Sequence, residues 1–203
     1  LFFSVLVFPL MYIGNIIGLI VAFSLQLLFR SPMTHIFEAS SFDENLLANF
    51  VFVVIFAPIV EELIFRKILI DRIIRYGKFL SIVVSGLFFG LFHGNFFQFF
   101  YATALGMLFA FIYVISGRVR YVIGLHMLVN FLGSVAAPFI ASISLEHAEK
   151  LEKVTSLENL LNALTSLVAL LVYAFILLAL TITGVILFIT QRKRFRINES
   201  ENA

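Results

Sequence analysis

The chain has 203 residues, of which 62% are hydrophobic and only 13% are charged, and its mean hydropathy is +1.08. These values exclude a water-soluble domain, and a net charge of +2 is too small to indicate nucleic-acid binding. The absence of Cys excludes disulfides, Cys-ligated zinc, iron–sulfur clusters and a thiol nucleophile, so any chemistry must use carboxylate, imidazole or hydroxyl groups.

Six apolar stretches follow one another along the chain, most of them near the ~20 residues that a helix needs to cross about 30 Å of hydrocarbon. They cover residues 1–29, 46–70, 79–93, 97–115, 122–140 and 164–190, and the third is short. Because backbone groups in lipid must be satisfied internally and no barrel-like alternation occurs, these stretches are predicted to be helices. We therefore expect an all-α, polytopic transmembrane bundle of about six spans, with residues 1–203 forming a single membrane domain.

Two parts of the chain do not follow this pattern. Residues 142–162 carry charged side chains among scattered apolar ones, which favours an interfacial or extramembrane helix. The chain begins with Leu1, directly in an apolar stretch, which leaves open whether further helices precede it.

The basic residues predict the orientation of the bundle. With six spans, eleven basic residues fall on one side: Arg66, Lys67, Arg72, Arg75, Lys78, Arg118, Arg120, Arg192, Lys193, Arg194 and Arg196. The other side holds only Arg30, Lys150 and Lys153. Because basic residues stay on the cytoplasmic side, we expect a multi-pass cell-membrane protein with both termini of this chain in the cytoplasm.

Small residues at four-residue spacing indicate which helices approach closely in lipid. Gly86, Gly90 and Gly94 form one such row in the third span, and a second row lies in the fourth span at Ala102, Gly106 and Ala110. These rows predict that the third and fourth helices pack against each other. A shorter pair, Gly14 and Gly18, is equally compatible with chance.

Two adjacent acids in the second span are the first candidates for chemistry, because charged groups at membrane depth are costly. Glu62 and Arg66 are i,i+4 neighbours in the favourable order for a helix ion pair. Glu61 lies about 100° around the helix and is free to face another partner. Pro58 cannot donate to the carbonyl of Val54, so we expect a local kink beside the acids. An interhelical salt-bridge cluster that only holds the bundle together is the alternative.

Two histidines and an asparagine supply the remaining candidates. His93 ends the third span, beside the glycine row, while His126 and Asn130 share one face of the fifth span. An imidazole and a carboxamide on one face could polarise a carbonyl group. Taken separately, each could equally be an interhelical hydrogen bond.

Taken together, these residues resemble the three ordered motifs of the CPBP family of intramembrane proteases, formerly called Abi. The motifs EExxxR, FxxxH and HxxxN correspond here to residues 61–66, 89–93 and 126–130, on three helices with one helix between the last two. The family includes type II CAAX prenyl endopeptidases and proteins similar to lysostaphin resistance protein A. The resemblance covers a core of about residues 46–134.

The resemblance implies hydrolysis of a peptide bond within the membrane. Glu61 and His93 would hold and deprotonate a water, His126 and Asn130 would stabilise the tetrahedral oxyanion, and Glu62 with Arg66 would form the structural pair that orients Glu61. The implied partners are a membrane-associated protein or peptide substrate and the lipid bilayer, without nucleic acid. We expect Glu61, His93, His126 and Asn130 to converge on one polar cavity reachable from the cytoplasm.

Three alternatives stay open. Glu61, His93 and His126 could ligate zinc, as similar sets do in several hydrolases, but HExxH is absent, so we favour a reaction without a metal cofactor. A bacteriocin-immunity or other non-catalytic membrane scaffold would use the same fold without chemistry. A proton or ion carrier would also use intramembrane Glu and His, but broken helices or repeated halves would be expected for it.

Overall fold

The computed structural model of the protein describes residues 2–29, 46–140, 142, 157–195 and 197, and regular structure in these ranges is helical. The long helical segments are α1 (Phe2–Phe29), a composite helix from α3 to η3, α6 (Lys78–Phe92), α7 (Phe96–Ser116), α8 (Val119–Phe131) with its extension η4 (Leu132–Ala136), and α10 (Leu157–Thr190). Five of these segments are long and apolar enough to cross a membrane, and α6, with 15 residues, is the short one. The predicted all-α, multi-pass membrane fold is confirmed. Of the predicted interfacial stretch, residues 143–156 lie outside the described residues, and its end forms the start of α10.

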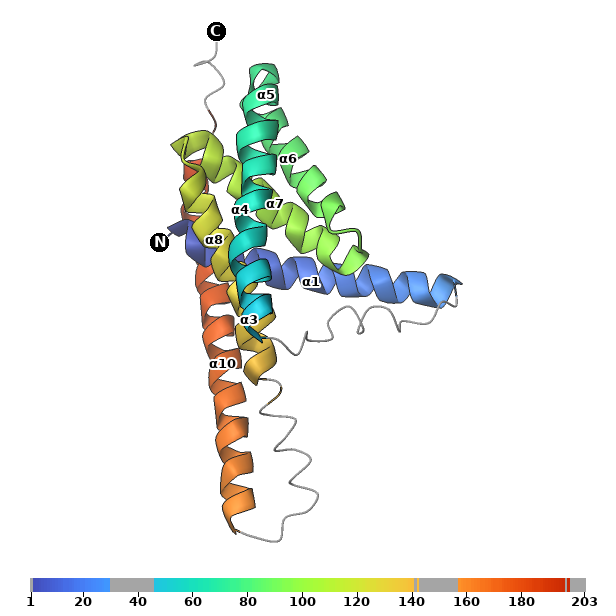
Figure 1. The fold of residues 1–203 in the computed structure, drawn as a ribbon, viewed down its shortest axis with the longest axis vertical. Coiled ribbons are helices and arrows are strands. Elements are labelled where there is room, and N and C mark those ends of the chain that lie inside the picture. Colours follow the sequence, from blue (N-terminus) through green and yellow to red (C-terminus); the bar gives the residue numbers. More distant parts are fainter. Residues whose placement is uncertain (1, 30–45, 141, 143–156, 196, 198–203) are drawn as a thin grey trace.

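The composite helix that carries both glutamates is drawn in cyan to teal in Figure 1. Its winding changes along its length. Its parts are α3 (Leu46–Asn49), η1 (Phe50–Phe56), α4 (Ala57–Glu62), η2 (Leu63–Ile70), α5 (Asp71–Ile73) and η3 (Ile74–Tyr76). Both η1 and η2 are π-helical, with hydrogen bonds that reach five residues back. On both sides of the glutamates, close to Pro58 where we expected a local kink, the helix is wound more widely than an α-helix.

Helix α7 lies at the centre of the bundle. Its buried side chains form an apolar core with α1 and α8, made of Leu6, Val7, Leu105, Leu108, Phe109, Ile112, Val122 and Val129. Because α7 contacts α1, α6 and α8, it sets the distance between the helices that carry the candidate site residues.

Close contact of α6 with α7 confirms the prediction from the glycine rows. A Cβ atom on Gly86 would lie 2.8 Å from the backbone nitrogen of Met107, and one on Gly90 would lie 2.9 Å from the carbonyl of Phe99. Gly94 does not belong to this contact, because it follows the helix end in a turn with a φ of 68° and no atom near its missing Cβ. The shorter pair also has a packing role, since Gly14 and Gly18 of α1 face α7.

The chain segments that carry most basic residues lie at one end of the molecule. Ile74, Val119 and Phe195 pack around one buried cluster together with Phe3 near the N-terminus. The turn after the composite helix, the turn between α7 and α8, and the C-terminal segment therefore share one side (Figure 1). This arrangement agrees with the predicted grouping of these segments, except that Arg66 is buried beside Glu62. Arg30, Lys150, Lys153 and Arg196 lie outside the described residues, and the assignment of this side to the cytoplasm stays a prediction.

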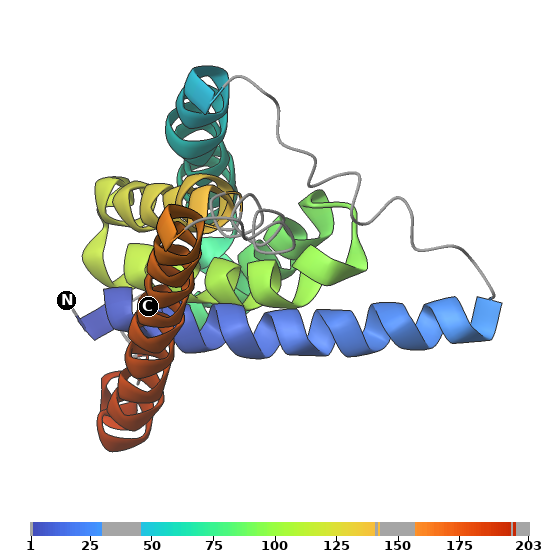
Figure 2. The same cartoon turned by 90° about the horizontal axis from the view of Figure 1, so that it is seen from below.

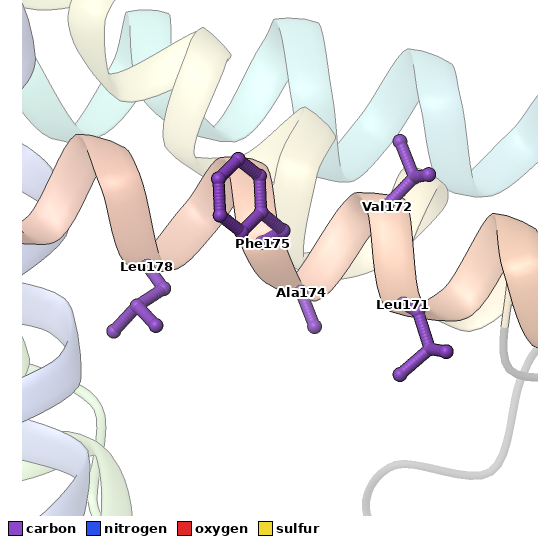
Figure 3. A pocket seen from close by; sticks show the side chains of 5 residues that line it. All are labelled: Leu171, Val172, Ala174, Phe175 and Leu178. Carbon is purple, nitrogen blue, oxygen red and sulfur yellow. The ribbon is translucent and has the colours of Figure 1, made fainter.

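Helices α1 and α10 cross steeply rather than running side by side (Figures 1 and 2). At the crossing, a Cβ atom on Gly184 would lie 2.7 Å from the ring of Pro9. Between its start and this crossing, α10 carries an open apolar hollow lined by Leu171, Val172, Ala174, Phe175 and Leu178 (Figure 3). Since no lining side chain is polar or titratable, this surface fits contact with lipid and has no means of catalysis.

Candidate functional site

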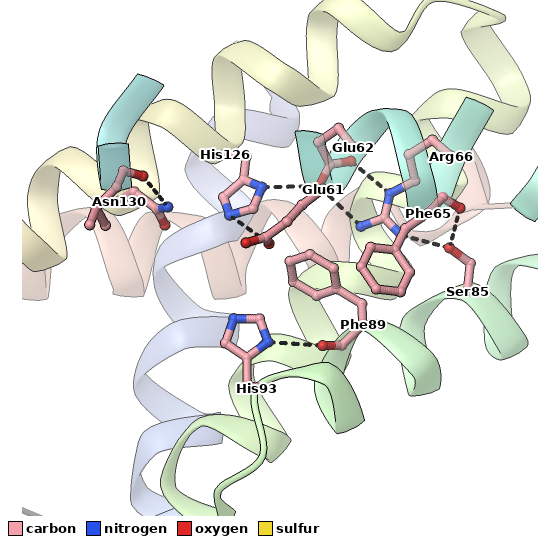
Figure 4. A network of polar contacts seen from close by, with 10 residues as sticks. Glu61, Glu62, Phe65, Arg66, Ser85, Phe89, His93, His126 and Asn130 are labelled. Atoms are coloured by element: carbon pink, nitrogen blue, oxygen red, sulfur yellow. Dashed lines mark hydrogen bonds and ion pairs between the residues drawn. The ribbon is translucent and has the colours of Figure 1, made fainter. Parts of the chain in front are cut away.

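The site is built around Glu62, a fully buried carboxylate that accepts hydrogen bonds from two helices (Figure 4). Arg66, one turn further along the same helix and also fully buried, donates from Nε to Oε2 at 2.7 Å and from Nη2 to Oε1 at 3.3 Å. His126 of α8 lies on the other side, with Nδ1 3.0 Å from Oε1. The predicted Glu62–Arg66 ion pair is therefore present, and Glu62 also binds a histidine that spacing along one helix could not indicate.

Arg66 is held in place by α6 as well as by Glu62. Its Nη1 donates to Oγ of Ser85 at 2.6 Å, and Ser85 donates in turn to the carbonyl of Phe65 at 2.9 Å. The guanidinium carbon lies 5.0 Å from the centroid of the Phe89 ring, a cation–π contact. A buried ion pair survives only when its remaining donors are satisfied, and Ser85 and Phe89 meet that need here.

Glu61 occupies the position that the helix geometry predicts, turned away from Arg66 and toward α8 (Figure 4). Its Oε2 lies 3.9 Å from Nε2 of His126. That separation is too long for a hydrogen bond, and Oε2 is buried without any hydrogen-bond partner in the part of the chain that the structure describes. A buried carboxylate oxygen without a partner is costly and marks a place where another polar group can bind.

The hydrogen bonds of the two histidines determine which ring nitrogen faces Glu61. An ionised Glu62 can accept a hydrogen bond but cannot donate one. Nδ1 of a neutral His126 therefore carries the proton, and Nε2 presents its lone pair. Nδ1 of His93 lies 2.9 Å from the carbonyl of Phe89, so the same tautomer follows there. Both imidazoles pack edge-on against the Phe89 ring, with centroids 5.0 and 5.4 Å away. Phe89 thus separates the two histidines and orients both of them.

The sequence-predicted site residues are only partly brought together. The structure joins Glu61, Glu62, Arg66 and His126 in one network, with His93 next to it across Phe89 (Figure 4). Asn130 follows His126 by one turn, but its Nδ2 donates to the backbone carbonyl of Val53 at 2.9 Å. The cavity expected around all four catalytic candidates, and its opening toward the cytoplasm, stay predictions.

The same residues can be tested as a zinc site. Each imidazole donates Nδ1–H to an oxygen and leaves Nε2 free, which is the usual arrangement of a histidine that ligates a metal. However, no three His, Asp or Glu side chains among the described residues lie close enough together to hold an ion. The donor chemistry of Glu61, His93 and His126 suits zinc, whereas their arrangement does not form a three-ligand centre.

Several residues of this network were not predicted from the sequence. Ser85 precedes Phe89 by four residues, and a polar side chain on that face of an apolar helix was a usable signal. The sequence offered no signal for two other groups, because their partners lie on another helix. They are the side chain of Asn49, which donates to the carbonyl of Ser134 at 3.0 Å, and the backbone carbonyl of Val53.

Comparison with known proteins finds similarity in the segment that carries the site. Residues 43–132 match the family model described as type II CAAX prenyl endopeptidase Rce1-like. A Bacillus subtilis (strain 168) protein named "Putative membrane peptidase YdiL" is 34% identical over 77 residues, which cover 37% of this chain and 32% of that relative. The match therefore spans about a third of the relative's length. No solved structure matches the chain significantly. The matched segment contains Glu61, His93, His126 and Asn130, and these comparisons support the resemblance to the CPBP family.

Proposed function

We propose that the protein is an intramembrane endopeptidase that hydrolyses a peptide bond of a membrane-associated protein or peptide. The observation that carries this proposal is the pair of unshared acceptors 3.9 Å apart, Oε2 of Glu61 and Nε2 of His126. A single water at about 2.8 Å from each atom could donate one proton to each of them.

The chemistry follows from this placement. Glu61 takes a proton as the water oxygen attacks the carbonyl carbon of the substrate, and the carbonyl oxygen becomes an oxyanion. His93 presents Nε2 from across Phe89 and assists in holding the water. The proton then passes to the leaving amine, which completes hydrolysis without a covalent enzyme intermediate.

His126 is suited to stabilise charge during this reaction. The proton that Glu61 takes from the water can pass to Nε2 before it reaches the leaving amine, and the imidazolium then lies between two carboxylates, one of which is the buried Glu62 at 3.0 Å. A buried carboxylate on Nδ1 fixes the tautomer and stabilises the positive ring, as the aspartate does in serine-protease triads. The protonated Nε2 can then donate to the oxyanion. The role of Glu62 and Arg66 is to hold His126 and to place Glu61.

The substrate reaches this site in or beside the bilayer, because the segments that carry Glu61 and His126, Leu47–Tyr76 and Val119–Ile140, are long and apolar enough to cross a membrane. We place the end that carries the basic segments, and both termini of this chain, on the cytoplasmic side. The proposal uses no metal and no nucleic acid.

The test is a search for new protein termini. Membranes from cells that produce the wild type, Glu61→Gln or no protein are compared by N-terminal proteomics. We expect at least one membrane-associated protein to show a new N-terminus only with the wild type. A Glu61→Gln variant that reaches wild-type abundance and yields the same termini would contradict the protease and favour a non-catalytic immunity or scaffold protein.

A further inference from the structure

The wide turns of the composite helix leave one backbone carbonyl without its regular donor. At the end of η1, the N–H of Ala57 bonds to the carbonyl of Phe52, five residues earlier. In the same register, an N–H at position 58 would bond to the carbonyl of Val53. Residue 58 is a fully buried proline, which has no N–H to donate. Further along the helix, the N–H of Leu63 bonds to Ile59 and Val60, so the wide register ends after the proline.

Asn130 supplies the missing donor from another helix. Its Nδ2 lies 2.9 Å from the carbonyl oxygen of Val53, across 77 positions of sequence (Figure 4). In a lipid-surrounded bundle a carbonyl without a donor is costly, because no bulk water replaces the lost hydrogen bond. The side-chain amide therefore takes the place of the backbone N–H that Pro58 lacks.

We infer that Asn130 is a positioning residue. It replaces the hydrogen bond that Pro58 cannot donate, three residues before Glu61, and so holds Glu61 in place for the proposed reaction. This inference rests on the proposed function for its effect on activity, but not for its effect on the helix. When the Asn130–Val53 bond is lost, the wide turn before Pro58 is free to rewind. A shift there moves Glu61 relative to His126, whose separation determines whether both can hold one water.

A second bond between the same two segments provides a matched control. Nδ2 of Asn49 donates to the carbonyl of Ser134 at 3.0 Å, in the opposite direction from α3 to η4. Both bonds join an asparagine amide to a backbone carbonyl across one interface. Only the Asn130 bond compensates for a proline, so only that bond should depend on the residue at position 58.

The experiment is a double-mutant cycle between positions 130 and 58. Pro58→Ala restores an N–H that can reach the carbonyl of Val53 in the wide register; in an ordinary α-helical register, the N–H of Ala57 reaches it instead. We expect Asn130→Ala to lower kcat about 10²-fold with KM changed less than threefold in the wild-type background. In the Pro58→Ala background the same change should cost less than about threefold. Asn49→Ala should have equal effects in both backgrounds.

Two measurements do not depend on activity. In detergent, Asn130→Ala should lower the Tm by about 3–6 °C with Pro58 present and by much less with Pro58→Ala. Hydrogen exchange in the Asn130→Leu variant, which is of similar size and cannot donate, should rise in peptides covering residues 50–62 and not in α7.

The outcomes separate the two proposals. Rescue by Pro58→Ala in Tm and in hydrogen exchange supports the inference even when no proteolysis is found, and in that case only the proposed function fails. Equal losses from Asn130→Ala in both backgrounds, or unchanged exchange in residues 50–62, overturn the inference and favour Asn130 as a direct oxyanion donor. If Pro58→Ala does not fold, exchange in Asn130→Leu decides by itself.

Discussion

Nδ1 of His126 lies 3.0 Å from Oε1 of Glu62, so the second of the two adjacent glutamates, and not the first, fixes the ring. The other oxygen of Glu62 binds Arg66. Glu61 keeps an oxygen without a partner among the described residues and faces the free nitrogen of the same ring. Two neighbouring carboxylates thus differ in what they can do, and mutations can separate them.

Removal of the Arg66 side chain should destabilise the folded protein. Arg66→Ala leaves Glu62 charged, buried and bound only by His126, which we expect to cost about 3–5 kcal/mol of stability. Folded protein recovered in detergent and its Tm measure the effect. Lys67→Ala is the matched control, because it breaks an exposed i,i+4 pair with Asp71 on the same helix and should change neither value noticeably. Similar losses for both variants would show that the buried pair has no special role.

The two glutamates should respond differently to the same substitution. Glu61→Gln keeps size and polarity but cannot take a proton, so we expect normal yield and an activity loss of about 10²–10⁴-fold. Glu62→Gln removes the counter-ion of Arg66 and should reduce the yield of folded protein. Size-exclusion profiles and cleavage assays on equal amounts of protein measure both effects. An equal loss of yield for Glu61→Gln would mean that both acids are structural.

Ser85 should contribute more than another buried serine on the same helix. Ser85→Ala removes the group that satisfies Arg66 and the carbonyl of Phe65, and we expect it to cost about 1–3 kcal/mol. Ser81 is equally buried, but its hydroxyl bonds back to Gly77 of its own chain segment, so Ser81→Ala should cost less than about 1 kcal/mol. Thermal unfolding of the two variants tests this difference, and the reverse order would refute it.

The contact of α6 with α7 should be too close to accommodate one added methyl group at Gly86. A Cβ on Gly86 would meet Met107, including its backbone nitrogen at 2.8 Å, so Gly86→Ala should lower the Tm. A Cβ added to Gly124 of α8 would meet no atom within 4 Å, and Gly124→Ala should be neutral or stabilise by up to about 1 kcal/mol through helix propensity. Melting curves of both variants are compared with the wild type. A neutral Gly86→Ala would mean that the two helices are not in close contact.

Metal dependence can be decided on the purified protein. If Glu61 activates a water without a metal, activity should survive exhaustive chelation, and elemental analysis should find no stoichiometric zinc. A zinc enzyme would lose activity on chelation and regain it with added zinc, and His93→Ala and His126→Ala would each lose the metal. Zinc at one equivalent that disappears with either histidine would replace the metal-free mechanism while leaving the peptidase proposal in place.

Much of the architecture follows from the sequence alone, because a bilayer leaves few options. Long apolar stretches in lipid must satisfy their own backbone groups, so the helices and their approximate limits are determined locally. The Glu62–Arg66 pair is likewise local, since residues four apart lie on one face of a helix. The rows at Gly86 and Gly106 indicated the contact of α6 with α7 for the same reason: side-chain size along one helix face is visible in the sequence.

Only the tertiary structure decided which groups on different helices meet. The sequence placed His126 and Asn130 on one face of one helix, but not that the first would bind Glu62 and the second a carbonyl beside Pro58. It indicated that Pro58 would disturb the helix, but not that the wide winding before it would make Val53 the carbonyl that lacks a donor. These relations depend on the crossing and winding of helices more than 60 positions apart, which are set by how the whole bundle packs around α7.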